Sequence, residues 1–500
     1  MSTYKYLQEA FDFEKILFPG VQPPIHERIA IPKLSSNNDR DTMVLQQLMQ
    51  GTTKMDKINS LPPSEKKQEN MNIILFYGDD WRYDSLGIVN KHVKTPFLDA
   101  LAREGVLFTQ NAVTTSICWI SRACLATGQH YARHKTMKRE PPVPFHKHWN
   151  ETMFAQLINN GYFTASVGKW QPSKMDDGMF NYSTIYEGFH YKEEEHITDM
   201  NVLDALHFLQ NERKGVDDPF ALFVNFFAPH AEDNNPEQYL PQKLTRILYN
   251  ETDIPFGPTA TEESWNKLPF FLDENEEGRK RWRKRFDEPI KAQKMLKNYF
   301  RLITGVDFAC GRILEELKRQ NETENTLIIF TTDNGYYLSD HGLADKWYAH
   351  QESIRVPLII KDPRMNKNLI GTMNDAMTLS IDLAPTILQA AGITPPERMQ
   401  GDDISKLYTG DIIAGDKHWR REFYYEYPTI TTIAHIKHVQ ALVRKDYKYI
   451  LWPAYKVEEL FHLPSDPYEE NDLVKSIDPK YEKILEDLRI EFRRVQKNAA

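Results

Sequence analysis

From residue 72 onward the chain repeats one pattern, in which a short apolar run is followed by a segment with helical periodicity. The runs are apolar on both faces, which suits buried strands of a parallel sheet that is covered by helices on both sides. The five runs are NIILFYG (72–78), YFTASVG (162–168), FALFVNFF (220–227), TLIIFTT (326–332) and VPLIIK (356–361). The pattern predicts an α/β fold with a doubly wound, mostly parallel sheet.

Helices are expected between these runs. The candidates are TPFLDALAREG (95–105), TMFAQLINNG (152–161), MNVLDALHFLQNERKG (200–215) and an amphipathic segment around 291–320. After a linker with two prolines at 394–398, residues 438–452 have a strand-like pattern and a helix is expected from about 479. Because 500 residues exceed what one core usually supports, a second, smaller α+β domain is expected at the carboxyl end.

The sequence therefore predicts three parts. Residues 1–70 have no sustained periodicity and end in the polar stretch LPPSEKKQEN, so we expect an N-terminal extension that wraps the main domain. Residues 71–395 form the expected α/β domain, and residues 396–500 the C-terminal α+β subdomain.

Charge and hydropathy narrow the possible partners. A net charge of -9 gives no basic footprint for nucleic acid, although a local pocket can still be positive. No apolar run is long enough to cross a bilayer. The first twenty residues lack a basic head followed by an apolar stretch, so they do not form a secretory signal. We expect a periplasmic or secreted protein if a signal has been removed, and a cytoplasmic protein otherwise.

Ionisable residues follow four of the five predicted strands. The first run is followed by Asp79 and Asp80, the second by Lys169, and the fourth by Asp333 and Asn334. His230 comes just beyond the third run. Ligands in open α/β sheets bind beyond the carboxyl ends of the strands, so the sequence predicts one active site at this edge.

Asp79, Asp80, Asp333 and Asn334 offer only oxygen ligands, and three of the four are anionic. Such a set suits a hard cation such as Ca²⁺ or Mg²⁺ better than zinc. Taken separately, the Asp-Asp pair is typical of a helix N-cap and Asp-Asn-Gly of a turn. Together, on adjacent strand ends, they favour a metal site.

The segment Cys118–Gly128 carries the strongest local signal. It contains Cys118, Ser121, Arg122 and a later Thr-Gly pair, and so resembles the sulfatase signature, in which the cysteine is oxidised to formylglycine. Further segments resemble sulfatase segments in the family's order, over about residues 71–475. They are ILFYGDDWRYDSLG (74–87), TPFLDALAREGVLF (95–108), VGKW (167–170), FAPH (227–230), TTDNGYYLSDHGLADKW (331–347), ESIRVPLII (352–360) and LFHLPSDPYEENDL (460–473).

The resemblance implies an alkaline-phosphatase-like fold, with 71–395 as the sulfatase catalytic domain, and a sulfuric ester hydrolase acting on a sulfated saccharide. It also implies one Ca²⁺ ion and a formylglycine made from Cys118 by a maturation enzyme. By position, Asp79, Asp80, Asp333 and Asn334 hold the metal. Arg122 steadies the hydrated aldehyde, Lys169 and Lys346 bind sulfate oxygens, and His230 protonates the leaving alcohol.

Two positions depart from the family pattern. Ile120 stands where the signature has proline, and Gln171 stands where Gly-Lys-Trp-His would place a histidine. Two alternatives stay open. One is a phosphatase or phosphonate monoester hydrolase, because the superfamily shares this metal site and tetrahedral anions look alike. The other, which rests on Ile120, is an unmatured protein that binds sulfated glycans without cleaving them.

Residues beside the site are candidates for substrate contact. The residues proposed to contact substrate are Trp119, Gln171, His341 and Trp347. Trp81 and Trp170 also adjoin site residues, and aromatic faces suit either a sugar ring or internal packing. The run Arg279–Arg285 could grip a polyanionic glycan, but its acidic flanks favour an exposed charged face. Cys124 and Cys310 are expected to be structural thiols, and three cysteines cannot form a disulfide framework.

Overall fold

The structure is a computed structural model that describes residues 71–500, except for 138–143, 173–174, 176–177, 187, 214, 216–217, 413–414 and 431–435. The extension predicted for residues 1–70 lies outside the described residues. Within the described part, no helix is long and apolar enough to cross a membrane.

An eight-stranded mixed sheet forms the centre of the fold, in the order β12-β2-β11-β8-β1-β7-β3-β4. Its strands are β1 (Asn72–Gly78), β2 (Val106–Ala112), β3 (Phe163–Gly168), β4 (Tyr182–Ile185), β7 (Phe220–Asn225), β8 (Thr326–Thr332), β11 (Leu358–Lys361) and β12 (Thr372–Leu379). Strand β1 pairs in parallel with both β7 and β8, and β3 pairs in parallel with β7. The prediction of a mostly parallel sheet is confirmed.

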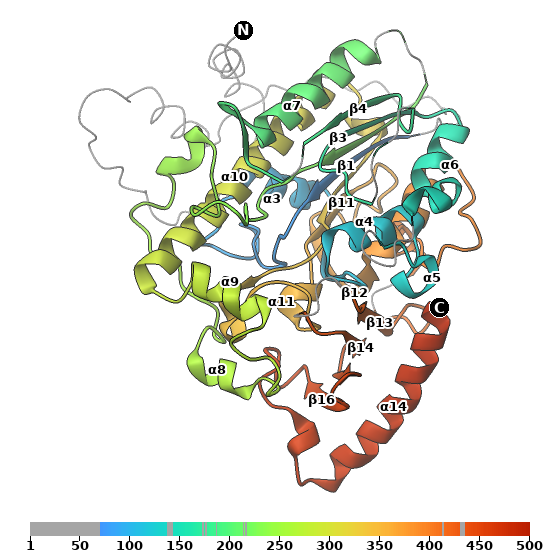
Figure 1. Cartoon of the computed structure of the whole chain (residues 1–500). Helices are drawn as coiled ribbons and strands as arrows, with labels where there is room; N and C mark the ends of the chain where they lie inside the picture. Colours follow the sequence, from blue (N-terminus) through green and yellow to red (C-terminus); the bar gives the residue numbers. More distant parts are fainter. Residues whose placement is uncertain are drawn as a thin grey trace. The chain divides into compact units, whose positions relative to one another are not determined.

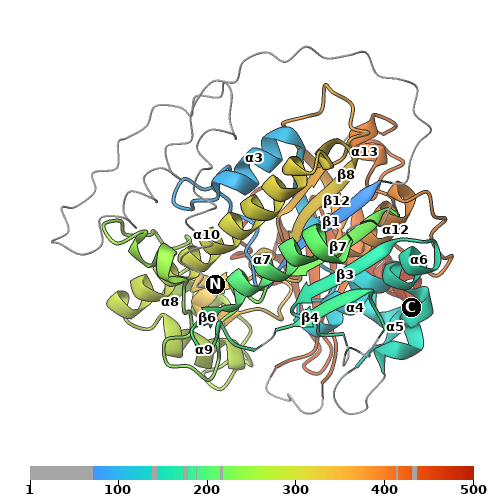
Figure 2. The same cartoon turned by 90° about the horizontal axis from the view of Figure 1, so that it is seen from above.

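Helices cover both faces of this sheet (Figures 1 and 2). On one face, α3 (Pro96–Glu104) and α7 (Ile197–His207) each pack against the long helix α10 (Pro289–Arg319). The helices α4 (Cys118–Thr127), α6 (Met153–Asn159) and α12 (Leu383–Ala390) pack together on the other. The strands between them are almost wholly buried, which explains why their sequences are apolar on both faces.

One predicted strand runs in the opposite direction. The run at 356–361 forms β11, which pairs antiparallel with both β8 and β2. An apolar run records burial on both faces but not the direction of the strand, so its sequence could not distinguish the two cases. The strands β2, β4 and β12 were not predicted, because polar residues such as Thr109 and Asn374 interrupt their apolar pattern.

The carboxyl end forms a separate four-stranded antiparallel sheet in the order β13-β14-β15-β16, as expected for an α+β unit. Its strands are β13 (Glu422–Tyr427), β14 (Val439–Arg444), β15 (Tyr447–Trp452) and β16 (Val457–His462). Helix α14 (Pro479–Ala499) packs its apolar side on this sheet (Figure 1). The opposite side of the sheet shares an apolar cluster with α4, which brings the C-terminal unit close to Cys118.

The remaining α-helices and strands of the described residues are short and connect the main ones. They are β5 (Tyr191–Lys192), β6 (Glu195–His196), β9 (Tyr337–Leu338), β10 (Ala344–Asp345), α5 (Tyr131–His134), α8 (Glu262–Lys267), α9 (Glu277–Arg285), α11 (Gln351–Ile354) and α13 (Lys406–Thr409).

Candidate active site

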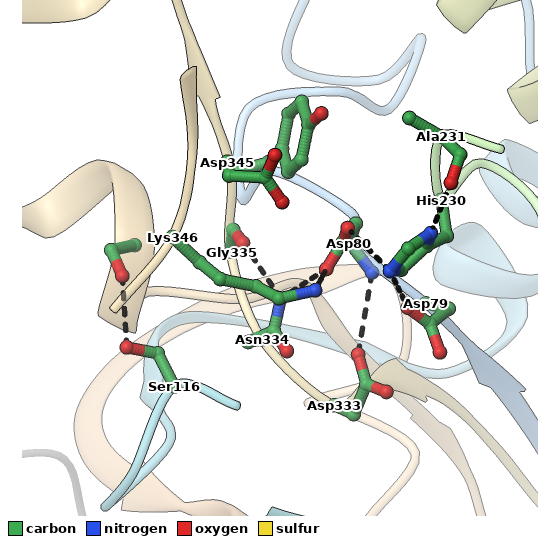
Figure 3. A network of polar contacts seen from close by, with 12 residues as sticks. Asp79, Asp80, Ser116, His230, Ala231, Asp333, Asn334, Gly335, Asp345 and Lys346 are labelled. Atoms are coloured by element: carbon green, nitrogen blue, oxygen red, sulfur yellow. Dashed lines mark hydrogen bonds and ion pairs between the residues drawn. The ribbon is translucent and has the colours of Figure 1, made fainter. Parts of the chain in front are cut away.

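The strand ends of the central sheet bring the predicted ionisable residues together. Asp79 and Asp80 follow β1, and Asp333 and Asn334 follow the adjacent strand β8. Lys169 follows β3, and His230 lies on the loop after β7. Figure 3 shows His230 and Lys346 reaching Asp80 from opposite sides. Five separate parts of the chain therefore meet at one polar centre.

The acidic residues form a compact oxygen cluster. One carboxylate oxygen from each of Asp79, Asp80 and Asp333 lies within 4.8 Å of the others. Three buried oxygens, Asp79 Oδ1, Asp80 Oδ2 and Asn334 Oδ1, have no hydrogen-bond partner among the described residues. Buried oxygens normally have a partner, so these atoms fit a bound cation. An all-oxygen donor set fits Ca²⁺ or Mg²⁺.

The turn at Asp80 is held by several contacts. The φ angle of Asp80 is 58°, in the left-handed region, which is uncommon for a residue with a side chain. The Tyr299 hydroxyl donates to the Asp80 carbonyl at 2.7 Å, and the Asn334 amide donates to Asp80 Oδ1 at 2.6 Å. The Asp80 backbone N–H donates to Asp333 Oδ1 at 3.3 Å. These contacts turn the Asp80 carboxylate into the cluster.

Burial and charge act in opposite directions on these carboxyls. Burial raises the pKa of Asp80 to about 6, against the lowering effect of Lys346. Burial and the nearby Asp79 raise the pKa of Asp333 to about 7. For Asp79, burial is outweighed by Lys169 and the other nearby cations, which hold its pKa below the usual range. A cation in the cluster would relieve the repulsion among the three groups.

Cys118 is the first residue of α4 and is almost fully buried. Its sulfur, an Asp79 carboxylate oxygen and a His230 ring nitrogen all lie within 4.8 Å of one another. The amino end of this ten-residue helix also carries partial positive charge, which favours an anion beside Cys118. Burial raises the pKa of the Cys118 thiol, while Lys169 and Lys346 oppose that shift.

Arg122 lies one turn along α4 and joins the helix to the acidic cluster. Its guanidinium contacts Asp333 Oδ2 at 2.9 Å and Asp79 Oδ2 at 3.0 Å. It also donates to the Lys169 carbonyl at 3.0 Å. Arg122 therefore orients two carboxylates. Its contact with a hydrated aldehyde stays a prediction.

Lys169 is positioned by a close approach of two strands. Gly168 has a φ of 95°, and a Cβ at this position would lie 2.0 Å from the Asn225 carbonyl oxygen. The Lys169 backbone N–H then donates to the same oxygen at 2.7 Å. The buried Lys169 ammonium forms an ion pair with Asp79.

Lys346 lies between two residues in the left-handed region, Asp345 at φ 75° and Trp347 at φ 89°. Its buried ammonium forms an ion pair with Asp80. Burial would lower the pKa of Lys346, but Asp80 and other nearby acidic groups raise it, so the group stays charged.

His230 faces the same carboxylates with its Nε2 atom, which lies 3.5 Å from Asp80 Oδ2. Its Nδ1 atom lies 2.6 Å from the Ala231 carbonyl oxygen, so Nδ1 carries a hydrogen and donates it. Burial, with Lys346 and Lys169, lowers the pKa of His230 to about 3.

The predicted substrate-contact residues have mixed surroundings. Trp119 and Trp347 are buried in the apolar cluster between α4 and the C-terminal sheet. Gln171 is partly exposed, and its Oε1 atom has no hydrogen-bond partner among the described residues. Substrate contact by these residues stays a prediction. Trp81 packs edge-on against Phe330, and Trp170 packs among Phe145, Phe154 and Phe180.

His341 lies in a different setting from the acidic cluster. Its ring is 1% exposed and stacks on His350, with a centroid distance of 4.8 Å. It lines a cavity of about 240 Å³ together with Lys267, Glu470 and other residues of α8 and the C-terminal unit. None of the residues of the acidic cluster lines this cavity. The role of His341 in substrate binding stays a prediction.

Cys124 and Cys310 are buried and unbridged, as expected for structural thiols. Arg279–Arg285 is an exposed charged face only in part, at Lys280, Arg283 and Lys284. The structure buries Arg279 and Arg285 in helix α9 and pairs them with acidic side chains. The partners of Arg285 come from distant parts of the sequence, so the local acidic flanks did not reveal them.

Asn225 and Tyr425, like Tyr299, lie at the site and were not predicted. Asn225 ends β7, and its Oδ1 atom lies 3.5 Å from Arg122. Tyr425, on β13 of the C-terminal sheet, contacts Ser116 and donates to the Trp347 carbonyl at 2.6 Å. An asparagine at the end of an apolar run is a usable signal, whereas nothing local distinguishes Tyr425 among the neighbouring tyrosines.

The comparisons with known proteins agree with this geometry. The family model described as "Sulfatase" matches residues 71–393, and the one described as "N-sulphoglucosamine sulphohydrolase, C-terminal" matches residues 339–498. The first match covers the central sheet and the whole acidic cluster. The chain belongs to the sulfatase family, whose members are sulfuric ester hydrolases of the alkaline-phosphatase-like superfamily.

Individual relatives span most of the chain. An N-acetylglucosamine-6-O-sulfatase of Bacteroides thetaiotaomicron is 24% identical over 482 residues, which cover 82% of this chain and 84% of the relative. A solved structure in complex with its substrate D-glucosamine-2-N,6-O-disulfate has a TM-score of 0.71 at 22% identity, covering 86% of this chain and 98% of that one. A phosphonate monoester hydrolase of Agrobacterium radiobacter has a TM-score of 0.68 at 21% identity, covering 84% and 96%.

Proposed function

We propose that this sulfatase removes sulfate from a sulfated carbohydrate, with a formylglycine nucleophile made from Cys118 by a maturation enzyme and with one bound Ca²⁺ ion. The observation that carries the proposal is the meeting of Cys118 Sγ, an Asp79 oxygen and a His230 nitrogen within 4.8 Å. Hydrolysis of a sulfate ester needs a nucleophile at sulfur, a metal ligand beside the sulfate oxygens and a proton donor at the leaving oxygen, and these groups supply all three around one ester.

The similar proteins support a sugar substrate. The relative from Bacteroides is named for a sulfated amino sugar, and a similar solved structure was determined with a disulfated glucosamine. The identity of the sugar and the position of its ester are separate questions, which the assay below addresses.

The metal would be held by Asp79, Asp80, Asp333 and Asn334, where three unpartnered oxygens point to a cation. Bound there, Ca²⁺ would supply positive charge that polarises a sulfate oxygen. Formylglycine would supply a hydroxyl nucleophile that is regenerated after each turnover.

The chain's own cations would bind and orient the sulfate. Lys169 and Lys346 lie on the two sides of the cluster and carry charge that can neutralise sulfate oxygens as the sulfur is attacked. Arg122 keeps the Asp79 and Asp333 carboxylates in place. The positive end of α4 adds to the attraction for the anion.

His230 would deliver the proton to the departing oxygen. In the neutral ring Nδ1 donates to Ala231, so Nε2 faces the cluster without a hydrogen. Its pKa is low partly because Lys346 and Lys169 repel the imidazolium. A sulfate anion between these lysines would offset their charge and favour the protonated ring, whose Nε2–H can then donate.

The test is a substrate panel scored for released anion. Sulfated monosaccharides and oligosaccharides should release sulfate, and matched phosphate and phosphonate monoesters should react more slowly. Faster release of phosphate or phosphonate would favour the rival hydrolase, since these tetrahedral anions resemble sulfate. Mass spectrometry of the tryptic peptide ending at Arg122 should detect formylglycine in active protein. Binding of sulfated glycans with only unmodified thiol and no turnover would favour the unmatured binding protein.

A further inference from the structure

Helix α9 connects the two loops that carry His230 and Lys346. Its residues Arg281 and Arg285 are four apart and therefore lie on one side of the helix. Both arginines contact the same two carboxylates. Asp345 immediately precedes Lys346, and Asp233 lies three residues after His230.

Each of the two arginines forms an ion pair with each of the two carboxylates. Asp345 Oδ2 accepts from Arg281 at 2.8 Å and from Arg285 at 2.5 Å. Asp233 Oδ1 accepts from Arg281 at 2.8 Å and from Arg285 at 2.9 Å. The side chains of Arg285 and Asp345 are each 1% exposed, so these charges are shielded from solvent and cannot bind a substrate directly.

The backbone beside Lys346 needs such support. Asp345 and Trp347 both have left-handed φ angles, a conformation that persists only where the surroundings impose it. Arg281 also lies over the Trp347 ring, 5.3 Å from its centroid. Figure 3 shows Asp345 beside Lys346 as the lysine extends to Asp80. The arginines therefore hold the residues on both sides of Lys346.

We infer that Arg281 and Arg285, through Asp345 and Asp233, are positioning residues that fix Lys346 and His230 against the metal cluster. This inference rests on the proposed function, in which Lys346 binds sulfate and His230 donates a proton. The arginines act only through the loops that they hold.

The test is a double-mutant cycle with Lys346. Asp345→Asn keeps the shape of the side chain and weakens its pairing, and Arg281→Gln removes an arginine that is partly exposed and so endangers folding less. Each variant should lower kcat/KM for a sugar sulfate by roughly 10²-fold, the effect expected for a misplaced catalytic group. In a Lys346→Ala background Asp345→Asn should cost no more than a few-fold, because the group that it positions is gone. Arg281→Gln should cost less there than in the parent enzyme, because only its effect on the His230 loop through Asp233 remains.

Two controls separate positioning from loss of stability. Arg283→Gln changes the same helix at a residue that pairs with Glu274, and Arg420→Gln breaks an ion pair with the buried Asp382 elsewhere. Both should keep kcat/KM within a few-fold when activity is normalised to folded protein. The inference would be overturned if Arg420→Gln lowered kcat/KM as much as Arg281→Gln does. It would also be overturned if Asp345→Asn lowered kcat/KM by the same factor with Lys346 present and with Lys346 replaced by alanine. Full activity of Lys346→Ala alone would instead refute the proposed role of Lys346.

Discussion

The acidic side and the cationic side of the active site are held in different ways. Asp79, Asp80 and Asp333 directly follow β1 and β8, which pair without a break from Asn72 opposite Thr326 to Gly78 opposite Thr332. His230 and Lys346 stand on loops, and ion pairs to α9 hold these loops. Backbone pairing thus fixes the three aspartates, whereas side-chain ion pairs fix the loops of His230 and Lys346 and can be removed one at a time.

Cys118→Ala should have the largest effect, because Cys118 lies where the two sides meet. The variant keeps the apolar packing at the start of α4 but leaves no precursor for formylglycine. Sulfate release from any ester should fall to the rate without enzyme, measured by ion chromatography. Cys124→Ala is the matched control on the same helix, and it should retain turnover. Residual turnover of Cys118→Ala on both aryl and sugar sulfates would exclude a nucleophile derived from this residue.

Changes on the acidic side should come next. Removal of divalent metal by a chelator, or Asp80→Ala, should lower kcat by about 10³-fold or more, since a metal supplies several kcal/mol of charge stabilisation. Added Ca²⁺ should restore the chelated enzyme better than Zn²⁺, because all the proposed ligands are oxygens. Asp84→Asn, on the same loop and half-exposed, is the control that should leave kcat unchanged. A chelated enzyme with full activity would remove the metal from the mechanism.

The same contrast explains what the sequence could predict. Polar residues directly after buried apolar runs identified the acidic side, because strand ends of a parallel sheet share one edge. The ion pairs between α9 and the two loops were not predicted, because Asp233 and Asp345 lie about fifty to sixty residues from Arg281 and Arg285 along the chain. Local acidic neighbours instead suggested an exposed face for Arg279–Arg285, which holds for Lys280, Arg283 and Lys284 but not for the buried Arg279 and Arg285. Sequence near a residue predicts its backbone, but partners that close a loop are set by the tertiary fold.

On the cationic side, His230→Ala should discriminate between substrates. Loss of a general acid is typically worth about 10²–10⁴-fold when the leaving oxygen is strongly basic, as in a sugar alkoxide. An aryl oxide departs with little help, so nitrophenyl sulfate should lose far less. Lys169→Ala weakens sulfate binding and should reduce kcat/KM for both substrates by similar factors. Equal losses on both substrates in His230→Ala would mean that His230 positions sulfate and that another group donates the proton.

The smallest effect is expected at Tyr425, where the C-terminal sheet supports the cationic side. Its hydroxyl contacts Ser116, two residues before Cys118, and donates to the carbonyl of Trp347, the residue after Lys346. Tyr425→Phe leaves that buried carbonyl without its donor, which should cost about 1–3 kcal/mol of unfolding free energy. Since Ser116 and Trp347 each adjoin a site segment, kcat/KM should also fall by a few-fold.

Tyr424→Phe is the matched control, because successive residues of a strand point to opposite faces. The Tyr424 hydroxyl accepts from Gln440, and its ring packs against Phe492 of α14. This variant should lose stability in urea unfolding while its kcat/KM stays unchanged. If both variants lower activity equally at matched stability, the C-terminal sheet supports the site only through overall folding. If only Tyr425→Phe does so, one hydroxyl of the C-terminal unit helps to set the position of Lys346.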